Sequence, residues 1–195
     1  MGKIFYITGP SSTGKDTIFK RIRNQKILQL KNIVMYTTRP IREGEEDGVE
    51  YHFVNEEELD RLEMEGKVIE KRIYDTFHGF WTYFTVIDRD LLSEKQDYLM
   101  IGTVESFVKT KEYLGEDKVI PILITVDDGI RLQRALNREL AEEHPKFQEM
   151  CRRYLADAED FSEDKIKRAG IKKEFKNDDL EKCISEISKY IVTNK

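Results

Sequence analysis

The chain is poor in the residues that build disulfide scaffolds and cysteine-based metal centres. Among its 195 residues there are 2 cysteines and 4 prolines. Cys151 and Cys183 lie far apart and without CxxC spacing, which excludes a disulfide framework and a cysteine-based zinc site. We expect both thiols to be reduced and to lie in helices as small apolar core residues, and we expect the protein to be cytoplasmic.

Other absences exclude further classes of protein. No apolar run approaches the roughly 20 residues of a membrane span. Residues 1–9 do not resemble a signal peptide, because their short apolar part leads directly into a glycine-rich loop. The net charge is −5 and the 3 histidines are scattered, whereas nucleic-acid binders carry basic patches. We therefore expect no membrane or nucleic-acid partner and no histidine metal site, and the composition does not indicate an oligomeric state.

A regular alternation of strands and helices is present instead. β-Branched and apolar runs predict strands at residues 3–8, 33–36, 98–101, 119–126 and 172–175. Apolar residues at helical spacing predict helices at 15–23, 104–114, 128–142, 145–162 and from 178 onward. This order predicts an α/β fold with a mainly parallel sheet flanked by helices. Pro121 makes its strand either an edge strand or one whose first residues lie outside the ladder.

The segment between the second and third of these strands departs from the alternation. Residues 39–50 are charged and contain two glycines and a proline, which predicts a loop or a hairpin. Asn55 is a good N-cap and predicts a helix that begins there. Residues 68–73 and 80–86 are predicted to be extended and joined by a turn near residues 78–79.

The first chemically specific segment reads GPSSTGK, residues 9–15. It is a G-x-x-x-x-G-K loop between a predicted strand and a predicted helix. Its glycines let successive N–H groups surround a phosphate, and the helix N-terminus adds partial positive charge. Lys15 would then reach the β- and γ-phosphates of a nucleoside triphosphate. We expect the donor phosphates to lie against Gly9, Ser11, Ser12, Thr13, Gly14, Lys15, Asp16 and Thr17.

The residue after the lysine departs from the usual motif. A serine or threonine hydroxyl usually ligates Mg²⁺ there, but this chain has Asp16 followed by Thr17. The Asp16 carboxylate could hold a hydrated Mg²⁺, because magnesium prefers hard oxygen ligands. It could instead act only on the helix dipole, as acidic residues in a first turn do. Both interpretations stay open at the level of sequence.

The second specific segment reads TTRPIREGEEDGVEYHF, residues 37–53. Arg39 and Arg42 are three residues apart, so both guanidinium groups can converge on one phosphate. Tyr51 can add a hydroxyl donor. The alternative for a pair of arginines is a solvated basic turn, but the full run favours a phosphate site.

These two segments together resemble the guanylate kinase family, whose second motif is T-T-R-x-x-R-x-G-E-x-x-G-x-x-Y-x-F. The resemblance extends through the last helix. It implies a P-loop kinase fold and the transfer of a phosphoryl group from ATP, with Mg²⁺, to GMP. In the family the positions of Arg39, Arg42 and Tyr51 bind the acceptor phosphate. The implied parts are a core of residues 1–34, 85–127 and 166–195, an inserted acceptor lobe at 35–84, and a helical lid at 128–165.

The resemblance also implies how the acceptor base is bound. A family glutamate within an F/V-I-E segment accepts hydrogen bonds from guanine N–H groups, and VIE at residues 68–70 gives Glu70 that position. The alternative for Glu70 is an outward residue on an amphipathic strand. The family's following tyrosine and Y-G-T or Y-G-S segment corresponds to HGFWTYFT, in which Tyr83 or Thr85 takes these roles.

The sequence departs from the family pattern at two places around the base. The family has a serine two residues before T-T-R, and this chain has Met35. The family has an aspartate pair in its third strand, and this chain reads LMIGTVE at residues 99–105. Thr103 and Glu105 are the nearest polar replacements, so the acceptor is less strongly implied than the reaction.

The later part of the chain contains candidate lid arginines. Arg131, Arg134 and Arg138 lie on one predicted helix, and the last two match the family's R-x-x-x-R segment, which closes over the transferring phosphates. Arg153 is the preferred match to the family's second arginine segment, with Arg152 as the alternative. Positive charge at these places would stabilise the transferred group. For each arginine the alternative is a surface ion pair with nearby glutamates.

The stretch after the last strand and the choice of activity complete the sequence evidence. Asn177 matches an asparagine that lies near the donor adenine in the family, while capping of the last helix by Asp178 is the simpler role for this stretch. Besides GMP, another phosphorylated acceptor such as ribose 1,5-bisphosphate remains possible, because Asp16 resembles the GKD of ribose-bisphosphate phosphokinases. A third hypothesis is a non-catalytic guanylate-kinase-like binding module. Such modules typically lose the phosphate loop, which is intact here.

Overall fold

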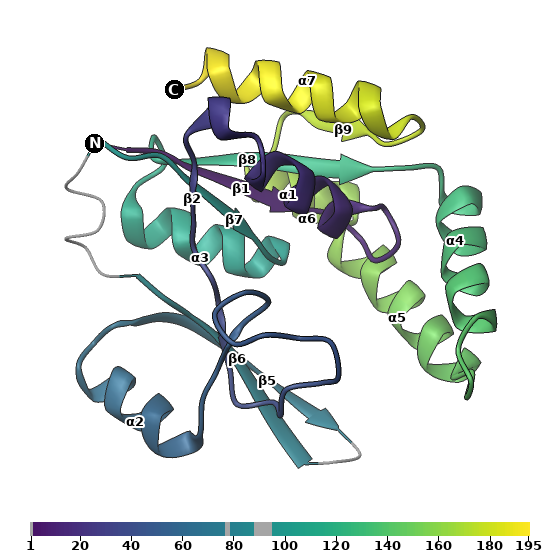
Figure 1. Cartoon of the computed structure of the whole chain (residues 1–195), viewed down its shortest axis with the longest axis horizontal. Helices are drawn as coiled ribbons and strands as arrows, with labels where there is room; N and C mark the ends of the chain where they lie inside the picture. The colour runs from purple at the N-terminus through teal and green to yellow at the C-terminus, as the bar shows by residue number, and fades with distance from the viewer. Residues whose placement is uncertain (1, 77–78, 88–94) are drawn as a thin grey trace.

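The computed structural model describes residues 2–76, 79–87 and 95–195 (Figure 1). The described residues form a five-stranded and a four-stranded sheet. Figure 1 shows the larger sheet between helices and the smaller sheet below it with its own helix. Part of the predicted turn at residues 78–79 lies outside the described residues.

The main sheet confirms the predicted parallel arrangement. Its strand order is β2-β7-β1-β8-β9, and each neighbouring pair is parallel. Such a sheet needs crossover connections that cover its faces with helices. Its strands are β1 Ile4–Thr8, β2 Lys31–Asn32, β7 Tyr98–Ile101, β8 Val119–Thr125 and β9 Glu174–Lys176.

Alternation along β1 divides the core into two layers. Phe5 and Ile7 pack in one cluster with apolar residues of α1 (Lys15–Arg23) and α7 (Leu180–Thr193). Ile4 and Tyr6 pack in the other cluster, with α3 (Val104–Leu114) and with residues next to α6 (Glu163–Arg168). All four side chains are fully buried. A buried side chain of this size stabilises the fold by roughly 1.5–3 kcal/mol, so β1 holds the following loop firmly.

The position of Pro121 settles the two alternatives for its strand. The edge-strand alternative is wrong, because β8 lies between β1 and β9. β9 pairs with β8 only from Leu123 onward. The other alternative holds only toward β9: Pro121 pairs with Tyr6 of β1 but precedes the part of β8 that pairs with β9, so its missing N–H leaves no ladder bond to β9 unmade.

The second sheet has the order β4-β3-β6-β5 and mixed strand directions. The side chain of Asn55 accepts a hydrogen bond from the Glu58 backbone N–H at 2.9 Å and so caps α2, as predicted. Leu59 and Leu62 of that helix pack on Phe84. The elements are β3 Tyr36–Thr37, β4 His52–Phe53, α2 Glu56–Met64, β5 Val68–Thr76 and β6 Gly79–Val86.

The single strand predicted at residues 33–36 is wrong. The chain makes two short strands on either side of this segment, β2 in the main sheet and β3 in the second sheet. Ile33 and Met35 are buried in the core cluster that lies against α3. The segment is therefore apolar because it crosses between the two sheets and is covered there, not because it forms a strand.

Two helices form a pair beside the main sheet, α4 (Asp128–Leu140) and α5 (Phe147–Asp160) (Figure 1). Both were predicted, slightly too long. The short helix α6 and the 3₁₀ helix at Lys26–Leu28 were not predicted. The last helix begins at Leu180 rather than 178, because the side chain of Asp179 accepts the Lys182 N–H at 2.9 Å and is the N-cap.

Both cysteines were predicted to be buried, and only one of them is. Cys183 is buried among the apolar residues of α7, and burial raises the pKa of its thiol to about 11. Cys151 is exposed on α5, so its assignment to the core is wrong. In the described ranges, no helix is both long enough and apolar enough to cross a membrane.

Candidate active site

The loop of residues 9–15 follows β1 and leads into α1, as the motif requires. Gly14 is left-handed, with φ 86°, at the N-cap of α1, where no side chain caps the helix. A Cβ at Gly14 would lie 2.5 Å from Asn177 Nδ2, and one at Gly9 would lie 2.4 Å from the Ile124 carbonyl oxygen. Both positions therefore require glycine, and the free N–H groups of the first turn of α1 remain available to an anion.

Asn177 holds this loop in place through hydrogen bonds. Its Nδ2 donates to the Thr13 carbonyl oxygen at 2.7 Å, and its backbone N–H donates to the Thr125 carbonyl oxygen at 2.8 Å. Asn177 is buried, and its own backbone carbonyl oxygen accepts from Arg134 Nη2 at 3.1 Å. These bonds link the loop, the end of β9 and α4. The predicted position of Asn177 near the donor adenine stays a prediction.

Lys15 stands at the first position of α1 with its side chain mostly covered. Its Nζ lies 3.7 Å from Asp16 Oδ2, and the Asp16 side chain is 77% exposed. Thr17 is also exposed. A lysine paired with an exposed carboxylate at a helix N-terminus can exchange this partner for a phosphate, because surface ion pairs are weak.

A carboxylate from α5 occupies a backbone donor of the loop. Asp157 Oδ2 accepts from the Ser11 N–H at 2.8 Å. The buried guanidinium of Arg131 lies beside it, with Nη1 3.7 Å from the same oxygen. Arg131 also stacks on the Tyr154 ring, with Cζ 3.9 Å from its centroid. A negatively charged group is thus already bound at the loop, between an N–H donor and an arginine.

The predicted lid arginines lie in different environments. Arg134 reaches Asn177 behind the loop, whereas Arg138 is exposed. Arg152 and Arg153 both donate to Glu149, from 2.7–2.8 Å, and are largely exposed. Hydrogen bonds from Arg152 and then Arg153 lower the pKa of Glu149 to about 2, with burial opposing them. In the structure, Arg152 and Arg153 therefore form surface ion pairs with Glu149. A catalytic role for either arginine stays a prediction.

The second phosphate site is built around Arg39. This side chain is 3% exposed, and its Nη2 donates to Glu45 Oε1 at 2.9 Å while its Nε donates to the Tyr83 hydroxyl at 3.1 Å. Tyr51 lies with its ring centroid 5.7 Å from Arg39 Cζ. Burial lowers the pKa of Arg39, but Glu45 more than offsets this and the net shift is upward.

Arg42 contributes differently from Arg39. Its side chain is exposed, and its backbone N–H donates to Glu45 Oε2 at 2.9 Å. Burial acts to raise the pKa of Glu45, but the bonds from Arg39 and the Arg42 backbone hold it below its usual value. Burial also raises the pKa of Tyr51 to about 12, so its hydroxyl stays protonated and able to donate. The site thus presents a carboxylate where a phosphate was predicted.

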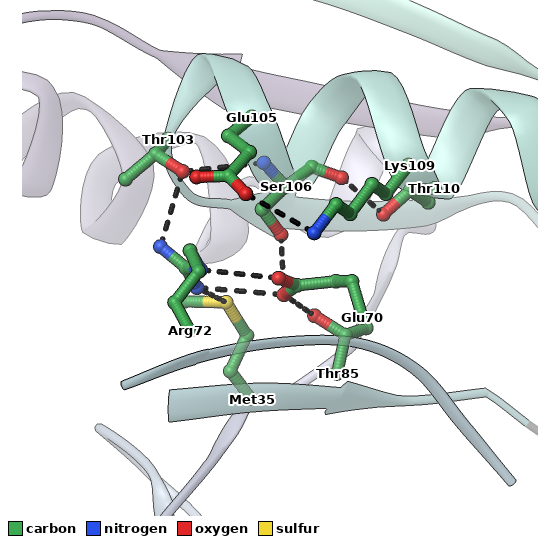
Figure 2. A network of polar contacts seen from close by, with 9 residues as sticks. All are labelled: Met35, Glu70, Arg72, Thr85, Thr103, Glu105, Ser106, Lys109 and Thr110. Atoms are coloured by element: carbon green, nitrogen blue, oxygen red, sulfur yellow. Dashed lines mark hydrogen bonds and ion pairs between the residues drawn. The ribbon is translucent and has the colours of Figure 1, made fainter. Parts of the chain in front are cut away.

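The predicted base-binding carboxylate lies inside a polar network (Figure 2). The Glu70 side chain is fully buried, so the outward-facing alternative is wrong. Glu70 Oε1 accepts from the hydroxyls of Thr85 at 2.6 Å and Ser106 at 2.7 Å. Glu70 Oε2 accepts from Arg72 Nε at 3.0 Å. Burial acts to lower the pKa of Arg72, but the charge of Glu70 outweighs it, so the net shift of this pKa is upward.

The two predicted polar replacements for the missing aspartates differ in role. Thr103 caps α3 by accepting the Ser106 N–H at 3.2 Å, and it also accepts from Arg72 Nη1 at 3.0 Å. Glu105 is 60% exposed and pairs with Lys109 at 3.1 Å (Figure 2). Thr103 therefore belongs to the network, and Glu105 points away from Glu70 toward its own helix.

Two cavities adjoin these residues. One of about 570 Å³ has Tyr74, Thr103 and Asp157 on its wall, so it lies where the second sheet, α3 and α5 meet. This volume is within the range of small-molecule sites. The other, of about 110 Å³, has Asp16 and Met35 on its wall, between α1 and the second sheet. Asp16 after the donor loop, Tyr51 of the phosphate site and Thr103 of the polar network thus adjoin open space.

Comparison with known proteins identifies the family. The guanylate kinase family model matches residues 1–194. The chain belongs to the guanylate kinase family. A guanylate kinase from Caldanaerobacter subterraneus subsp. tengcongensis is 30% identical over 196 residues, across all of this chain and 88% of that protein. Another, from Symbiobacterium thermophilum, is 27% identical over 198 residues, across all of this chain and 86% of that protein.

Structural comparison agrees with the family. The crystal structure of guanylate kinase from Anaplasma phagocytophilum matches with a TM-score of 0.68, over 98% of this chain and 85% of that one. At 20% sequence identity this likeness shows the shared fold alone. Together with the family match it confirms the P-loop kinase fold with a mainly parallel sheet. The family match itself makes the chain a nucleoside monophosphate kinase.

The guanylate kinase pattern did not reveal two residues that the structure brings into the site. Arg72 is two residues after Glu70 on β5, so alternation places both side chains on one face of the strand. That spacing was a usable signal. Asp157 gave no comparable signal, because its contact with Ser11 joins residues 146 positions apart.

The guanylate kinase family in general uses Mg²⁺, and the residues near the phosphate loop fit what that ion requires. No group of three or more His, Cys, Asp or Glu side chains in the described part of the chain could hold a metal by itself. Magnesium at a phosphate site usually takes one or two carboxylates and completes its shell with water and phosphate oxygens. The exposed Asp16 carboxylate beside Lys15 fits that requirement.

Proposed function

We propose that the chain transfers the γ-phosphoryl group of ATP to the phosphate of GMP, forming ADP and GDP. The observation that carries this proposal is the guanylate kinase family match over residues 1–194. The intact loop with its glycine-dependent close contacts adds support. The two isolated thiols support a cytoplasmic setting.

In the proposed reaction an oxygen of the acceptor phosphate attacks the γ-phosphorus. The bond to the oxygen that bridges the β- and γ-phosphorus atoms breaks, and ADP leaves with that electron pair. A nucleoside monophosphate is largely a dianion near neutral pH, since the second pKa of such a phosphate is about 6. No general base is needed, and catalysis consists of positioning and charge stabilisation.

The donor side of the site holds the triphosphate. Backbone N–H groups of the loop bind its phosphates, and Lys15 Nζ moves from Asp16 to the β- and γ-phosphate oxygens. The Ser11 N–H exchanges Asp157 for phosphate, so Asp157 must withdraw when ATP binds. Arg131, which lies beside that carboxylate, joins Arg134, Arg138 and Arg153 as a candidate for stabilising the transferred group.

The acceptor side holds the monophosphate. Arg39 and Arg42 bind its phosphate in place of Glu45, with hydroxyl donors from Tyr51 and Tyr83. Exchange of a carboxylate for a phosphate keeps the arginines neutralised in both states. We propose that residues 35–84 act as the acceptor lobe and 128–165 as the lid, each moving relative to the core when both substrates are bound.

Mg²⁺ is part of the proposal through Asp16. When bound, it neutralises charge on the β- and γ-phosphates. Asp16 would hold the hydrated ion through its carboxylate, and the helix dipole alone is the competing explanation for this residue.

Asp16→Asn tests this role for the carboxylate. We expect the Mg²⁺ concentration for half-maximal activity to rise by roughly 5- to 10-fold, because one charged oxygen ligand is lost, while kcat at saturating Mg²⁺ changes little. Initial rates across a Mg²⁺ titration at fixed ATP measure this. Asp60→Asn, an exposed change on α2, is the matched control. An unchanged titration curve in Asp16→Asn would leave only the helix-dipole role.

The two alternatives gain no specific support. A kinase for ribose 1,5-bisphosphate rests on Asp16 and on the changed base pocket. A non-catalytic binding module is disfavoured by the retained loop, in which Gly9 and Gly14 make close approaches that exclude a Cβ and Lys15 begins α1.

An acceptor panel tests the activity directly. ADP formation from ATP and Mg²⁺ is measured with GMP, dGMP, AMP, CMP, UMP and ribose 1,5-bisphosphate. We expect GMP to give kcat/KM at least about 100-fold above AMP, because a site built for guanine rejects an edge with reversed donors and acceptors. Faster turnover of ribose 1,5-bisphosphate would replace the proposed acceptor. Absence of turnover with every acceptor would favour the binding module.

A further inference from the structure

The carboxylate of Glu70, which was expected to bind guanine, already accepts hydrogen bonds from protein donors. A carboxylate offers about four lone-pair sites, and Glu70 uses three of them for Thr85, Ser106 and Arg72 Nε (Figure 2). Arg72 Nη2 also lies 3.4 Å from Oε1. Guanine N1–H and its 2-amino group need both oxygens of a carboxylate at once. Glu70 cannot accept both without giving up buried hydrogen bonds.

The guanidinium of Arg72 is the group that this network leaves available. A guanidinium has five N–H donors. Three of them point to Glu70 and Thr103. A fourth lies 3.9 Å from Met35 Sδ, a weak acceptor, and the fifth has no partner in the described part of the chain. One donor is therefore free for a ligand, and a second is held only by the weak Met35 Sδ acceptor.

Two partners of Arg72 line the open space of the site, although Arg72 itself is on the wall of neither cavity. Arg72 contacts Met35, on the wall of the smaller cavity, and Thr103, on the wall of the larger one. Met35 and Thr103 are also the places where the sequence departs from the family's base-binding pattern. The guanidinium of Arg72 therefore contacts both of the positions at which the sequence differs from the family.

We propose that Arg72, held in place by Glu70 and Thr103, recognises the acceptor base through the O6 and N7 acceptors of guanine. This inference rests on the proposed function, because it assumes that GMP is the acceptor. Arginine pairs well with these two atoms, whereas adenine presents a donor, its 6-amino group, at the position of O6. Glu70 is then a positioning residue, and the 2-amino group of guanine contributes little.

Kinetics of the unmodified protein test this without any substitution. kcat/KM is measured for GMP, for IMP, which lacks only the 2-amino group, and for 7-deaza-GMP, which lacks the N7 acceptor. We expect IMP within about 3-fold of GMP and 7-deaza-GMP lower by about 10-fold or more. If Glu70 bound the base directly, IMP would fall by at least about 10-fold and 7-deaza-GMP would match GMP. That pattern would overturn the proposal.

A double variant provides the second measurement. Arg72→Met alone would leave Glu70 as an unpaired buried charge and could unfold the protein, so Glu70→Gln is combined with it. The introduced amide keeps an oxygen acceptor for the Thr85 and Ser106 hydroxyls. We expect kcat/KM for GMP and IMP to fall together by about 100-fold, with AMP changed less than about 3-fold. Thermal unfolding verifies the fold, and Arg61→Ala, an exposed arginine on α2, is the control.

The outcomes separate this inference from the proposed function. Retention of GMP turnover within about 3-fold in the double variant would overturn the role of Arg72 and leave the activity intact. Absence of GMP turnover in the unmodified protein, with phosphorylation of a different acceptor, would overturn the proposed function and this inference together.

Discussion

Replacement of Lys15 by alanine is expected to lower kcat by on the order of 10³-fold or more. Lys15 lies at the N-terminus of α1, and its only described ion pair is with the exposed Asp16 at 3.7 Å. The ammonium is therefore free to move to the transferring phosphate, where a preorganised charge is worth several kcal/mol in the transition state. The backbone donors of the loop do not depend on this side chain and should still bind part of the triphosphate.

The measurement is kcat and KM for ATP and GMP at saturating Mg²⁺, together with a binding titration for GMP. We expect the dissociation constant of GMP to stay within about 3-fold, because the proposed acceptor-phosphate residues lie between β3 and β4, outside the loop of Lys15. Lys26→Ala, an exposed lysine in the 3₁₀ helix after α1, is the control and should retain full activity. A Lys15→Ala protein with more than a tenth of the original kcat would remove the lysine from the mechanism.

Replacement of Arg39 by alanine is expected to lower kcat/KM for GMP by about 100-fold or more, with little change in KM for ATP. Arg39 is buried and uses Nε, Nη1 and Nη2 for the Tyr83 hydroxyl, the Pro40 carbonyl and Glu45. In the proposed site this fixed guanidinium binds the acceptor phosphate, and charge-assisted hydrogen bonds of this kind are strong. Arg39→Lys should restore little, because an ammonium cannot reproduce the planar geometry.

Steady-state kinetics with varied GMP measure this effect, and Arg61→Ala on α2 is the matched control in the same lobe. Glu45 loses its partner in Arg39→Ala, so thermal unfolding must show that the second sheet is intact. An equal loss in KM for ATP and GMP would indicate a general disturbance of the fold and not loss of the acceptor phosphate site.

The phosphate loop was predictable because its signal is local. Seven consecutive residues contain the glycines, the lysine and the start of the helix, and their conformations follow from left-handed φ at Gly14 and close approach at Gly9. The same holds for helix caps such as Asn55, which bonds three residues onward. Strand and helix order then leads to a parallel sheet, because each crossover contains at least one helix.

Long-range contacts were not predictable in this way. Residues 33–36 were predicted to be one strand, since their apolar pattern does not say which sheet covers them. Cys151 was predicted to be buried, but helical periodicity alone does not show how far α5 extends beyond the core. In both cases the deciding fact is the position of a distant element.

The sequence by itself determined the family, the parallel α/β fold and the residue types at the two phosphate sites, because these depend on contiguous motifs and periodicity. Only the tertiary structure decided what surrounds Glu70. Thr85, Ser106 and Arg72 reach this carboxylate from β6, α3 and β5. A buried charge must find its partners wherever the fold supplies them. In this protein those partners occupy the oxygens that the motif assigns to guanine, which is why we propose that Arg72 recognises the base instead.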